Sequence, residues 1–146
     1  MADITLRVAA KAVIVNSEGR VLVLREASAA SYAESTNAGK YHVPGGRIEA
    51  GEAFKDGLVR EIREETGLEG VEIGDAIHVD EWRPEINGAV QQIVGVFMLC
   101  KYKGGDVRLS EEHDEALWMN PDERDKYALL PAELGAVEAF IRLRDR

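Results

Sequence analysis

Residues 45–68 read GGRIEAGEAFKDGLVREIREETGL, and the second half of this stretch has the periodicity of an amphipathic helix. The helix is expected to begin near Ala53 and to stop at Gly67, because glycine commonly follows the last turn of a helix. Its expected buried stripe consists of Leu58, Val59, Ile62 and Thr66. The stretch therefore predicts a glycine turn at Gly45-Gly46, followed by one amphipathic helix.

Three carboxylates share one turn of this helix. Glu61, Glu64 and Glu65 lie on one face, since a helix winds about 3.6 residues per turn. Like charges at this spacing repel, and each pair costs about 0.2–0.5 kcal/mol. A charged helix face is usually just solvated, so the triplet by itself is weak evidence of a site. A divalent cation is the simplest compensation for the three charges, and oxygen ligands favour Mg²⁺ or Mn²⁺.

The remaining segments alternate between apolar runs and turns. Strands are predicted over residues 8–15, 21–24, 41–44, 71–82 and 90–102, with a short one ending near Met119. The first two are joined by NSEG, which predicts a hairpin with Gly19 in its turn. A final helix begins at Pro131, and its expected core face is Leu134, Val137, Phe140 and Ile141. The pattern predicts one α+β domain over residues 1–146, with a mixed β-sheet sandwiched between helices.

Two polar segments interrupt the predicted strands. Glu26–Lys40 is small and polar without a clear period, which suggests a mobile loop, and Arg83–Ala89 forms a second loop. Both are expected to flank the carboxylate turn. Because binding residues concentrate on such loops, we expect substrate specificity to lie on them.

Composition and charge exclude several classes of partner. The 146 residues are 45% hydrophobic and 31% charged, the balance of a soluble globular protein, and no apolar run approaches the roughly 20 residues that span a membrane. The net charge of −9 argues against binding to DNA or RNA, although a metal-bridged phosphate stays compatible with it. Cys100 is the single cysteine, which fits a reducing compartment, so a cytoplasmic location is expected.

The glycine turn and the carboxylates together fit a known signature. Residues 45–68 resemble that of the Nudix (MutT-like) hydrolase family, G-x5-E-x7-R-E-U-x-E-E-x-G-U, in which U is a bulky aliphatic residue. Its fixed positions are filled by Gly46, Glu52, Arg60, Glu61, Ile62, Glu64, Glu65, Gly67 and Leu68. Such a match arises by chance about once in 10⁹ windows. The resemblance implies the Nudix fold and a hydrolase, dependent on Mg²⁺ or Mn²⁺, that acts on phosphoric anhydride bonds.

The resemblance also implies roles for the residues of the signature. The implied metal ligands are the Gly46 carbonyl, Glu61, Glu64 and Glu65, and Glu61 and Glu64 are the implied catalytic residues within the helix. Glu52 and Arg60 occupy positions that the family pairs to brace loop against helix. Gly57 departs from the family, which usually has alanine there. A tolerated substitution and the close approach of another backbone are both open as its explanation.

Outside the signature, Glu112 is the notable acid. It lies six residues before Trp118, where several MutT-like enzymes carry a metal ligand or general base. We therefore expect Glu112 to be both a metal ligand and a catalytic residue. The neighbouring acids that compete for this role are Glu111, Asp114 and Glu115.

Two arginines are the expected substrate contacts. The resemblance to the family implies this role for Arg25, at the end of the second strand, and Arg83 lies in the second loop, which is expected to flank the site. An ordinary surface arginine is the alternative for Arg25. His42, His78 and His113 lack the spacing of a zinc site and are given no ligand role.

The expected reaction is cleavage of a nucleoside diphosphate linked to another group. The compact length favours a (deoxy)nucleoside triphosphate, including oxidised forms, cleaved to monophosphate and pyrophosphate. Pro84 lies sixteen residues after Leu68, a spacing associated in the family with ADP-ribose hydrolysis, so ADP-ribose or a nucleoside-diphosphate sugar is the alternative. A catalytically idle Nudix-fold ligand-binding module, an acidic α+β domain with a chance helix, and a homodimer are further open alternatives.

Overall fold

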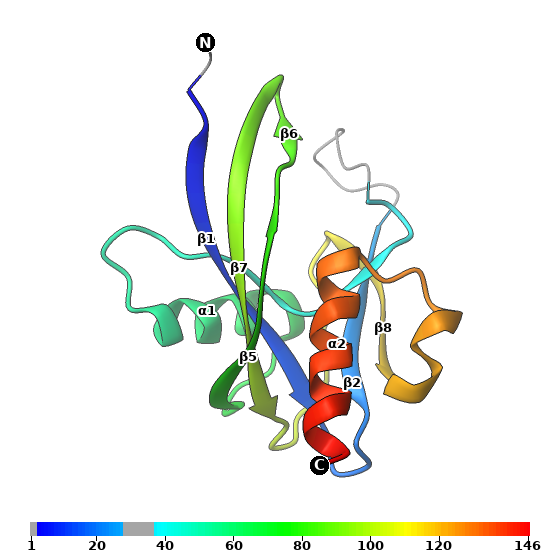
Figure 1. The fold of residues 1–146 in the computed structure, drawn as a ribbon. Helices are drawn as coiled ribbons and strands as arrows, with labels where there is room; N and C mark the ends of the chain where they lie inside the picture. Colours follow the sequence, from blue (N-terminus) through cyan, green and yellow to red (C-terminus); the bar gives the residue numbers. More distant parts are fainter. Residues whose placement is uncertain (1–2, 28–36) are drawn as a thin grey trace.

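A mixed β-sheet organises the chain, and the computed structural model describes residues 3–27 and 37–146 (Figure 1). The strands are β1 (Thr5–Val15), β2 (Val21–Glu26), β3 (Tyr41–His42), β4 (Gly45–Arg47), β5 (Glu72–Trp82), β6 (Glu85–Ile86), β7 (Ala89–Lys101) and β8 (His113–Met119). The main order is β3-β2-β1-β7-β5, while β4 pairs with β1, β6 with β7 and β8 with β2. The β1–β7 pair is parallel and the other pairs are antiparallel, so the sheet is mixed as predicted.

Two α-helices accompany the sheet. They are α1 (Phe54–Thr66) and α2 (Pro131–Arg144), and a 3₁₀ helix, η1 (Pro121–Lys126), precedes α2. The end of α1 is the predicted one, because Gly67 adopts φ 73° and its N–H donates to the Arg63 carbonyl. Pro131 stands at the start of α2, where a missing N–H costs nothing.

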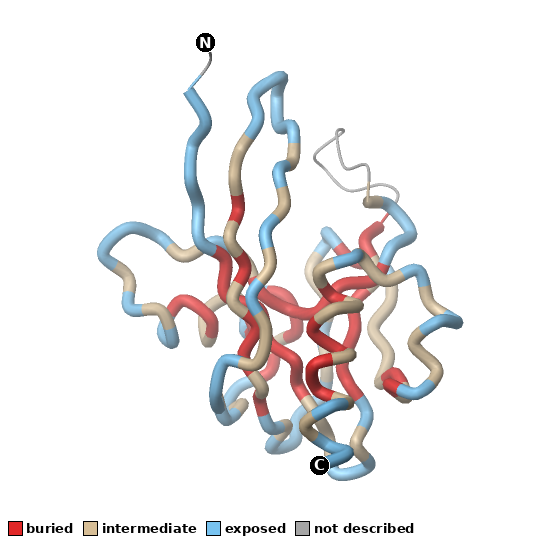
Figure 2. Tube along the Cα trace, viewed as in Figure 1, coloured by how far each residue is buried: buried red, intermediate tan, exposed pale blue. Residues whose placement is uncertain are grey.

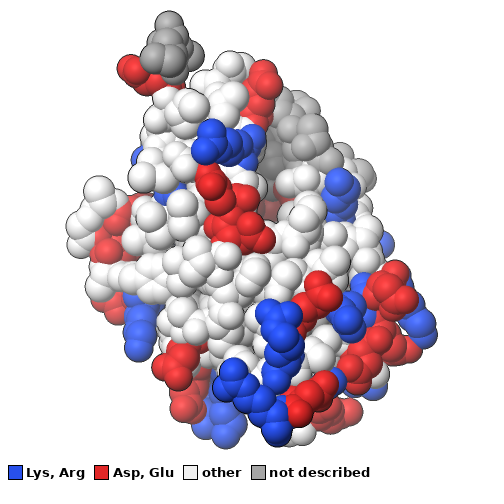
Figure 3. Space-filling model, viewed as in Figure 1, with Lys and Arg blue, Asp and Glu red and all other residues white. Residues whose placement is uncertain are grey.

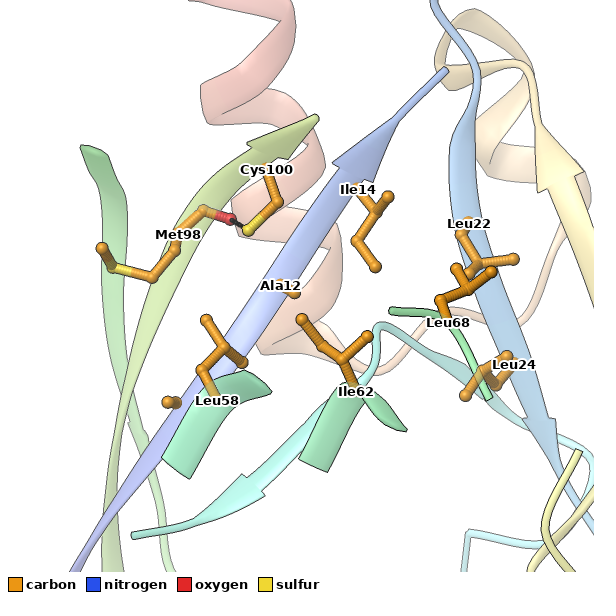
Figure 4. Packing of buried hydrophobic residues seen from close by; sticks show 10 residues of the cluster. Ala12, Ile14, Leu22, Leu24, Leu58, Ile62, Leu68, Met98 and Cys100 are labelled. Atoms are coloured by element: carbon orange, nitrogen blue, oxygen red, sulfur yellow. Dashed lines mark hydrogen bonds between the residues drawn. The ribbon is translucent and has the colours of Figure 1, made fainter. Parts of the chain in front are cut away.

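The two helices cover opposite faces of the sheet. Successive side chains of a strand point to opposite sides. Ile14 of β1 lies in the apolar cluster that contains Ile62 of α1, shown in Figure 4. Its neighbour Val13 lies in a second cluster with Val137 of α2. The predicted α+β architecture, with a sheet between helices, is therefore the observed one.

The predicted hairpin between β1 and β2 is confirmed at its turn, where Gly19 has a φ of 75° and its N–H donates to the Asn16 carbonyl, but its ladder is short. β1 meets β2 only at the pair Val15–Val21, after which β2 pairs with β8 and β3. Residues 9–14 of β1 are buried, so this strand lies inside the sheet with β7 along one edge and β4 on the other. The predicted strand 41–44 is shorter in the structure, where β3 covers only residues 41 and 42. The predicted glycine turn at Gly45-Gly46 is instead the start of β4, which pairs with β1.

The buried stripe of α2 is rotated from the predicted one. Val137 and Phe140 are buried as expected, whereas Leu134 and Ile141 are half-buried. The rotation turns Glu133 inward, where its Oε2 atom accepts a hydrogen bond from the Val43 N–H at 2.8 Å. The alanines Ala136 and Ala139 complete the buried side.

The structure describes only part of one predicted loop, and the outer ends of β1 and β7 are exposed. Most of the predicted Glu26–Lys40 loop, residues 28–36, lies outside the described residues, and the Arg83–Ala89 loop contains β6, which pairs with the start of β7. Figure 2 shows the first half of β1 and the tip of β7 exposed, with Leu6 60% exposed. Within residues 3–27 and 37–146, no helix has the length and apolar character to cross a membrane.

Candidate active site

Strand β4 brings the Gly46 backbone against a carboxylate of α1. A Cβ atom on Gly46 would lie 2.5 Å from the Glu61 carboxylate, and one on Gly45 would lie 2.2 Å from the Ala10 carbonyl oxygen. Gly45 therefore requires glycine, both for space against the backbone of β1 and for its φ of 146°, whereas a side chain at Gly46 would displace the Glu61 carboxylate. The structure thus brings together Gly46 and Glu61, two of the residues predicted to hold an ion.

Glu65 occupies the buried end of the carboxylate turn. Its Oε1 atom accepts a hydrogen bond from the Gly45 N–H at 2.7 Å. Burial raises the pKa of this carboxyl to about 8, although the nearby Lys11 ammonium acts in the opposite direction. A cation bound beside Glu65 would favour its charged form.

The other two glutamates are less enclosed. The Glu61 side chain is 16% exposed and that of Glu64 is 57% exposed. Burial also raises the pKa of Glu61. Nη1 of Arg60 lies 3.0 Å from Glu61 Oε1 and 3.4 Å from Glu64 Oε2, so part of the expected repulsion on this turn is balanced by one guanidinium.

Arg60 also reaches the loop before α1. Its Nε donates to Glu52 Oε2 at 2.8 Å and its Nη2 to Glu52 Oε1 at 3.0 Å. The Arg60 guanidinium lowers the pKa of Glu52 to about 2. A Cβ on Gly57 would lie 2.8 Å from Glu52 Oε1 and 2.5 Å from Ile48 Cδ1. Gly57 therefore makes room for two side chains rather than for another backbone.

A cavity of about 480 Å³ lies beside the carboxylate turn. It is lined by residues from α1, the segment before β8, the end of β5 and the start of α2. Among them are the predicted Glu65, Glu112 and Arg83, together with Trp82 and Pro84. A larger groove of about 830 Å³, lined by β5 and the end of α2, contains none of the predicted site residues.

A second hollow opens beside Glu61. It has a volume of about 400 Å³ and is lined by Arg7, Arg47 and Glu49 in addition to Glu61. The glutamates of α1 thus contribute to two separate hollows, one through Glu65 and one through Glu61. Basic side chains near Glu61 are suitable partners for phosphate oxygens.

The structure separates Glu112 from its competitors. Asp114 and Glu115 pair with Arg25, at 2.7 Å from its Nε and 3.0 Å from its Nη1 respectively. Glu112 instead lines the 480 Å³ cavity, whereas Arg25 is not among the residues that line it. Of the two predicted substrate-contacting arginines, Arg83 therefore lies at the cavity and Arg25 is engaged with β8.

Five buried polar residues of this cavity were missed in the sequence. They are Lys11, Glu26, His42, His113 and Glu133. The two histidines are 71 positions apart in sequence, yet their Nε2 atoms lie 2.6 Å apart, so spacing could not have joined them. Burial lowers the pKa of both imidazoles, and the Lys11 charge lowers that of His42 further. A lysine inside the apolar run VAAKAVIV was the available sequence signal for a buried charge.

The donor set suits a divalent cation. Carboxylate oxygens and a backbone carbonyl are hard ligands of the kind that Mg²⁺ and Mn²⁺ take. Gly46 of β4 and Glu61, Glu64 and Glu65 of α1 supply such atoms. Burial raises the pKa of Glu61 and of Glu65, and a bound cation would favour their charged forms. Figure 3 shows acidic side chains near the middle of the face seen in Figure 1, in which α1 lies behind the sheet, so this view does not display the α1 cluster.

Comparisons with known proteins show the family to which the chain belongs. The family model described as NUDIX domain matches residues 5–140. The CTP pyrophosphohydrolase of Escherichia coli (strain K12) is 30% identical over 145 residues, covering 91% of this chain and 90% of the relative. The nucleoside triphosphatase NudI of Escherichia coli O81 (strain ED1a) is 31% identical over 97 residues, covering 62% of this chain and 69% of the relative.

Solved structures give the same result. The crystal structure of the MutT protein from Methanosarcina mazei Go1 superposes with a TM-score of 0.79 at 29% identity, and 100% of each chain is covered. The domain match, the sequence relatives and this structure agree with the signature at residues 45–68. The chain belongs to the NUDIX family of hydrolases.

Proposed function

We propose that this Nudix pyrophosphohydrolase acts on a (deoxy)nucleoside triphosphate, including oxidised forms, and releases the monophosphate and pyrophosphate. The observation that carries the proposal is the 480 Å³ cavity, in which Trp82 and the carboxylates of Glu65 and Glu112 share one lining. The volume falls in the range of about 300–1,000 Å³ usual for small-molecule sites. A nucleotide needs both parts, an aromatic surface for its base and a cation site for its phosphates.

The polar lining near Trp82 suits a base that carries an amino group. Asp80 and Glu81 line the same cavity and present carboxylate oxygens, which accept hydrogen bonds. The exocyclic amino group of cytosine or adenine is a donor of this kind. The 30% identity to a CTP pyrophosphohydrolase supports a cytosine nucleotide as the first to be tested.

The chemistry follows from the placement of the acids. Gly46, Glu61, Glu64, Glu65 and Glu112 are the residues that would hold Mg²⁺ or Mn²⁺, whose positive charge stabilises phosphate oxygens as the anhydride bond breaks. Water attacks one phosphorus of the bridge, and the bridging P–O bond breaks to release pyrophosphate. Glu112, which lines the cavity, would accept the proton that this water loses.

An assay of several substrates tests the proposal. CTP, dCTP, dGTP, 8-oxo-dGTP, ADP-ribose and a dinucleoside polyphosphate are compared at equal Mg²⁺, with separate detection of monophosphate and pyrophosphate. A triphosphate is expected to give the highest kcat/KM, with the two products in equal amounts. Release of inorganic phosphate in place of pyrophosphate would contradict the proposal. Binding of nucleotide without any hydrolysis would also contradict it and would favour a catalytically idle ligand-binding module.

ADP-ribose or a nucleoside-diphosphate sugar remains the second candidate because of one specific residue. Pro84 lines the same cavity as Glu65, and its spacing from Leu68 is the sequence feature that indicates ADP-ribose. Prolines are common in turns for backbone reasons, so this observation weighs less than the shared lining of Trp82 and the acids. The same assay decides, since an ADP-ribose hydrolase releases AMP and ribose 5-phosphate.

We also propose that residues 1–146 form a single domain, that Mg²⁺ or Mn²⁺ is the activating ion and that the protein works in the cytoplasm, where its one cysteine stays reduced. Cys100 is buried and burial raises its pKa to about 12, which makes it unreactive. The predicted homodimer is tested by sedimentation equilibrium, in which a mass of one chain at micromolar concentration would exclude it.

A further inference from the structure

Two buried histidines lie in contact in the lining of the 480 Å³ cavity. Nε2 of His42 in β3 lies 2.6 Å from Nε2 of His113 at the start of β8. Both residues are buried, at 8% and 6% exposure. The strands that carry them both pair with β2, His42 opposite Leu24 and His113 opposite Glu26, so the sheet fixes their separation.

The far nitrogen of each ring also has a partner. Nδ1 of His42 lies 2.9 Å from the Val43 carbonyl oxygen, and Nδ1 of His113 lies 3.2 Å from Ser110 Oγ. When each Nδ1 carries the proton and donates it to that oxygen, both Nε2 lone pairs point to the same place. Histidines that bind metals are commonly oriented in this way, through a hydrogen bond from the other ring nitrogen.

A carboxylate lies at the same place. Glu65 Oε2 is 3.8 Å from His113 Nε2, and one potential ligand atom from each of His42, His113 and Glu65 lies within 4.8 Å of the others. Metal–nitrogen bonds of about 2.0–2.1 Å at a tetrahedral angle need the two nitrogens about 3.3 Å apart. A small rotation of one ring therefore converts the Nε2–Nε2 contact into a site for an ion.

We propose that His42, His113 and Glu65 form a second metal site, with two nitrogen ligands and one oxygen ligand, that takes a borderline ion of the Zn²⁺ class. Imidazole nitrogen suits Zn²⁺, Co²⁺, Ni²⁺ and Cu²⁺, whereas Mg²⁺ takes oxygen ligands. The site thus differs in chemistry from the oxygen-donor cluster formed by Gly46, Glu61 and Glu64.

The charges around the proposed site permit a cation. Lys11 Nζ is 3.4 Å from His42, but it lies at Nδ1, the side of the ring away from His113. Glu133 offsets its charge, with Oε2 3.9 Å from Lys11 Nζ. Glu65 and Glu112 then supply the negative charge that faces the ion.

Glu65 would be shared between the two sites. An ion held by His42 and His113 uses a carboxylate that the oxygen-donor cluster also needs. Zn²⁺ is therefore expected to lower Mg²⁺-dependent turnover by competing for Glu65, and this consequence rests on the proposed function. The existence of the site does not, because metal binding is measured without substrate.

The first experiment uses untagged, metal-free wild-type protein with Cu²⁺ as a spectroscopic probe. Electron paramagnetic resonance at one equivalent of Cu²⁺ is expected to show hyperfine coupling to two imidazole nitrogens. A spectrum with oxygen ligands only would overturn the proposal. This measurement needs no variant, so it decides the question even where a substitution prevents folding.

The second experiment uses the three histidines of the chain as their own controls. Zn²⁺ affinity is measured by competition with a chromophoric chelator for wild type, His42→Gln, His113→Gln and His78→Gln. His42→Gln and His113→Gln are each expected to bind Zn²⁺ at least about tenfold more weakly, because one ligand is lost. In the Cu²⁺ spectrum each of these two variants should also lose the coupling to one imidazole nitrogen. His78 contacts Phe97 and Asp80 outside the cluster, so its variant should match wild type.

Two results would contradict the assignment. Unchanged Zn²⁺ affinity in folded His42→Gln and His113→Gln would place the ion on carboxylates, and a loss in His78→Gln would place it elsewhere. A failure of the proposed function gives a different pattern, in which no nucleotide is hydrolysed but the nitrogen couplings and the effects of the variants persist.

Discussion

Arg60 and Glu52 are joined by two hydrogen bonds, Nε to Oε2 at 2.8 Å and Nη2 to Oε1 at 3.0 Å. The same guanidinium donates from Nη1 to Glu61 at 3.0 Å, so one side chain connects the loop before α1 with the carboxylate turn. Paired, parallel hydrogen bonds between arginine and carboxylate fix orientation as well as position. We propose that this pair braces the loop and holds Glu61 in place.

Arg60→Ala is expected to lower the melting temperature by several degrees and to reduce kcat as well, because both the loop and Glu61 lose their partner. Arg63→Ala is the matched control, an exposed arginine of the same helix that pairs with Glu69 at 3.4 Å and should have little effect. Thermal melting and steady-state kinetics measure the two effects. Equal behaviour of both variants would argue against a brace.

The Glu52 carboxyl should make stability depend on pH in the acid range. Its pKa is lowered to about 2 in the folded protein, against about 4.3 in an unfolded chain. Its contribution is therefore fully present above about pH 4.3 and is lost as pH falls through about 2. Denaturation of wild type and Glu52→Gln between pH 6 and 2 should show a difference that shrinks with acid. A constant difference would mean that Glu52 is not ionised in the native pair.

Glu64→Gln and Glu65→Gln should each lower turnover by about 10²-fold or more while the fold is retained, because a charged oxygen ligand is lost. Turnover is measured at saturating Mg²⁺, and circular dichroism checks the fold. Near-wild-type rates in either variant would remove that residue from the metal cluster.

The stability of the metal-free protein should depend on the ionisation of Glu65. The pKa of buried Glu65 is raised to about 8 in the folded state, so the metal-free protein should lose stability as pH rises from about 4.3 to about 8. Glu65→Gln should abolish most of this dependence. Denaturation in excess chelator at several pH values is the measurement, and an unchanged slope in Glu65→Gln would show that other groups cause it.

Glu112→Gln is expected to lower kcat by at least about a hundredfold with little change in KM, as loss of a general base does. Glu111→Gln is the matched neighbour, exposed and outside the cavity lining, and should be mild. Glu115→Gln should also be mild for catalysis, since Glu115 pairs with Arg25. A larger effect at Glu111 or Glu115 would show that one of these residues, and not Glu112, is the general base. Three mild variants would move the base to Glu61 or Glu64.

Trp82 offers a direct signal of nucleotide binding. The chain has two tryptophans, and Trp118 packs against Tyr102 in the α1-side core, with ring centroids 4.8 Å apart. Trp118→Phe therefore leaves Trp82 as the single indole. The fluorescence of Trp82 should be quenched by CTP in the absence of metal. The quenching should be stronger when a divalent ion that does not support hydrolysis is present. Quenching that is equal for inorganic triphosphate would mean that the base does not contact Trp82.

The sequence predicted the positions of the helices and strands better than it predicted which strands pair. The period of residues 54–66 and the glycine at position 67 are local signals, and the helix lies where they indicate. Which strand lies beside β1 is not a local property, and the short NSEG turn suggested β2 where β7 provides most of the pairing. Glu133 likewise altered the face of α2, because a buried hydrogen bond to Val43 outweighed the apolar pattern.

The candidate site was predictable to the extent that it lies on one segment. Gly46, Glu52, Arg60 and Glu61 are close in sequence, and the structure places them in contact. The cavity was not predictable, since Lys11, His42, Trp82 and His113 come from four different strands. Only the curvature of the sheet brings these side chains to one place.

The parallel pairing of β1 with β7 has a consequence for synthesis on the ribosome. Thr5 pairs with Gln91 and Val15 with Lys101, so a nascent chain cannot close the centre of its sheet until residue 101 has left the exit tunnel. The helix that carries the glutamates is made well before that point and must wait without its supporting strand. Long-range pairing of this kind slows folding and exposes apolar strands meanwhile. The apolar β1 segment is therefore where a chaperone would be needed during translation.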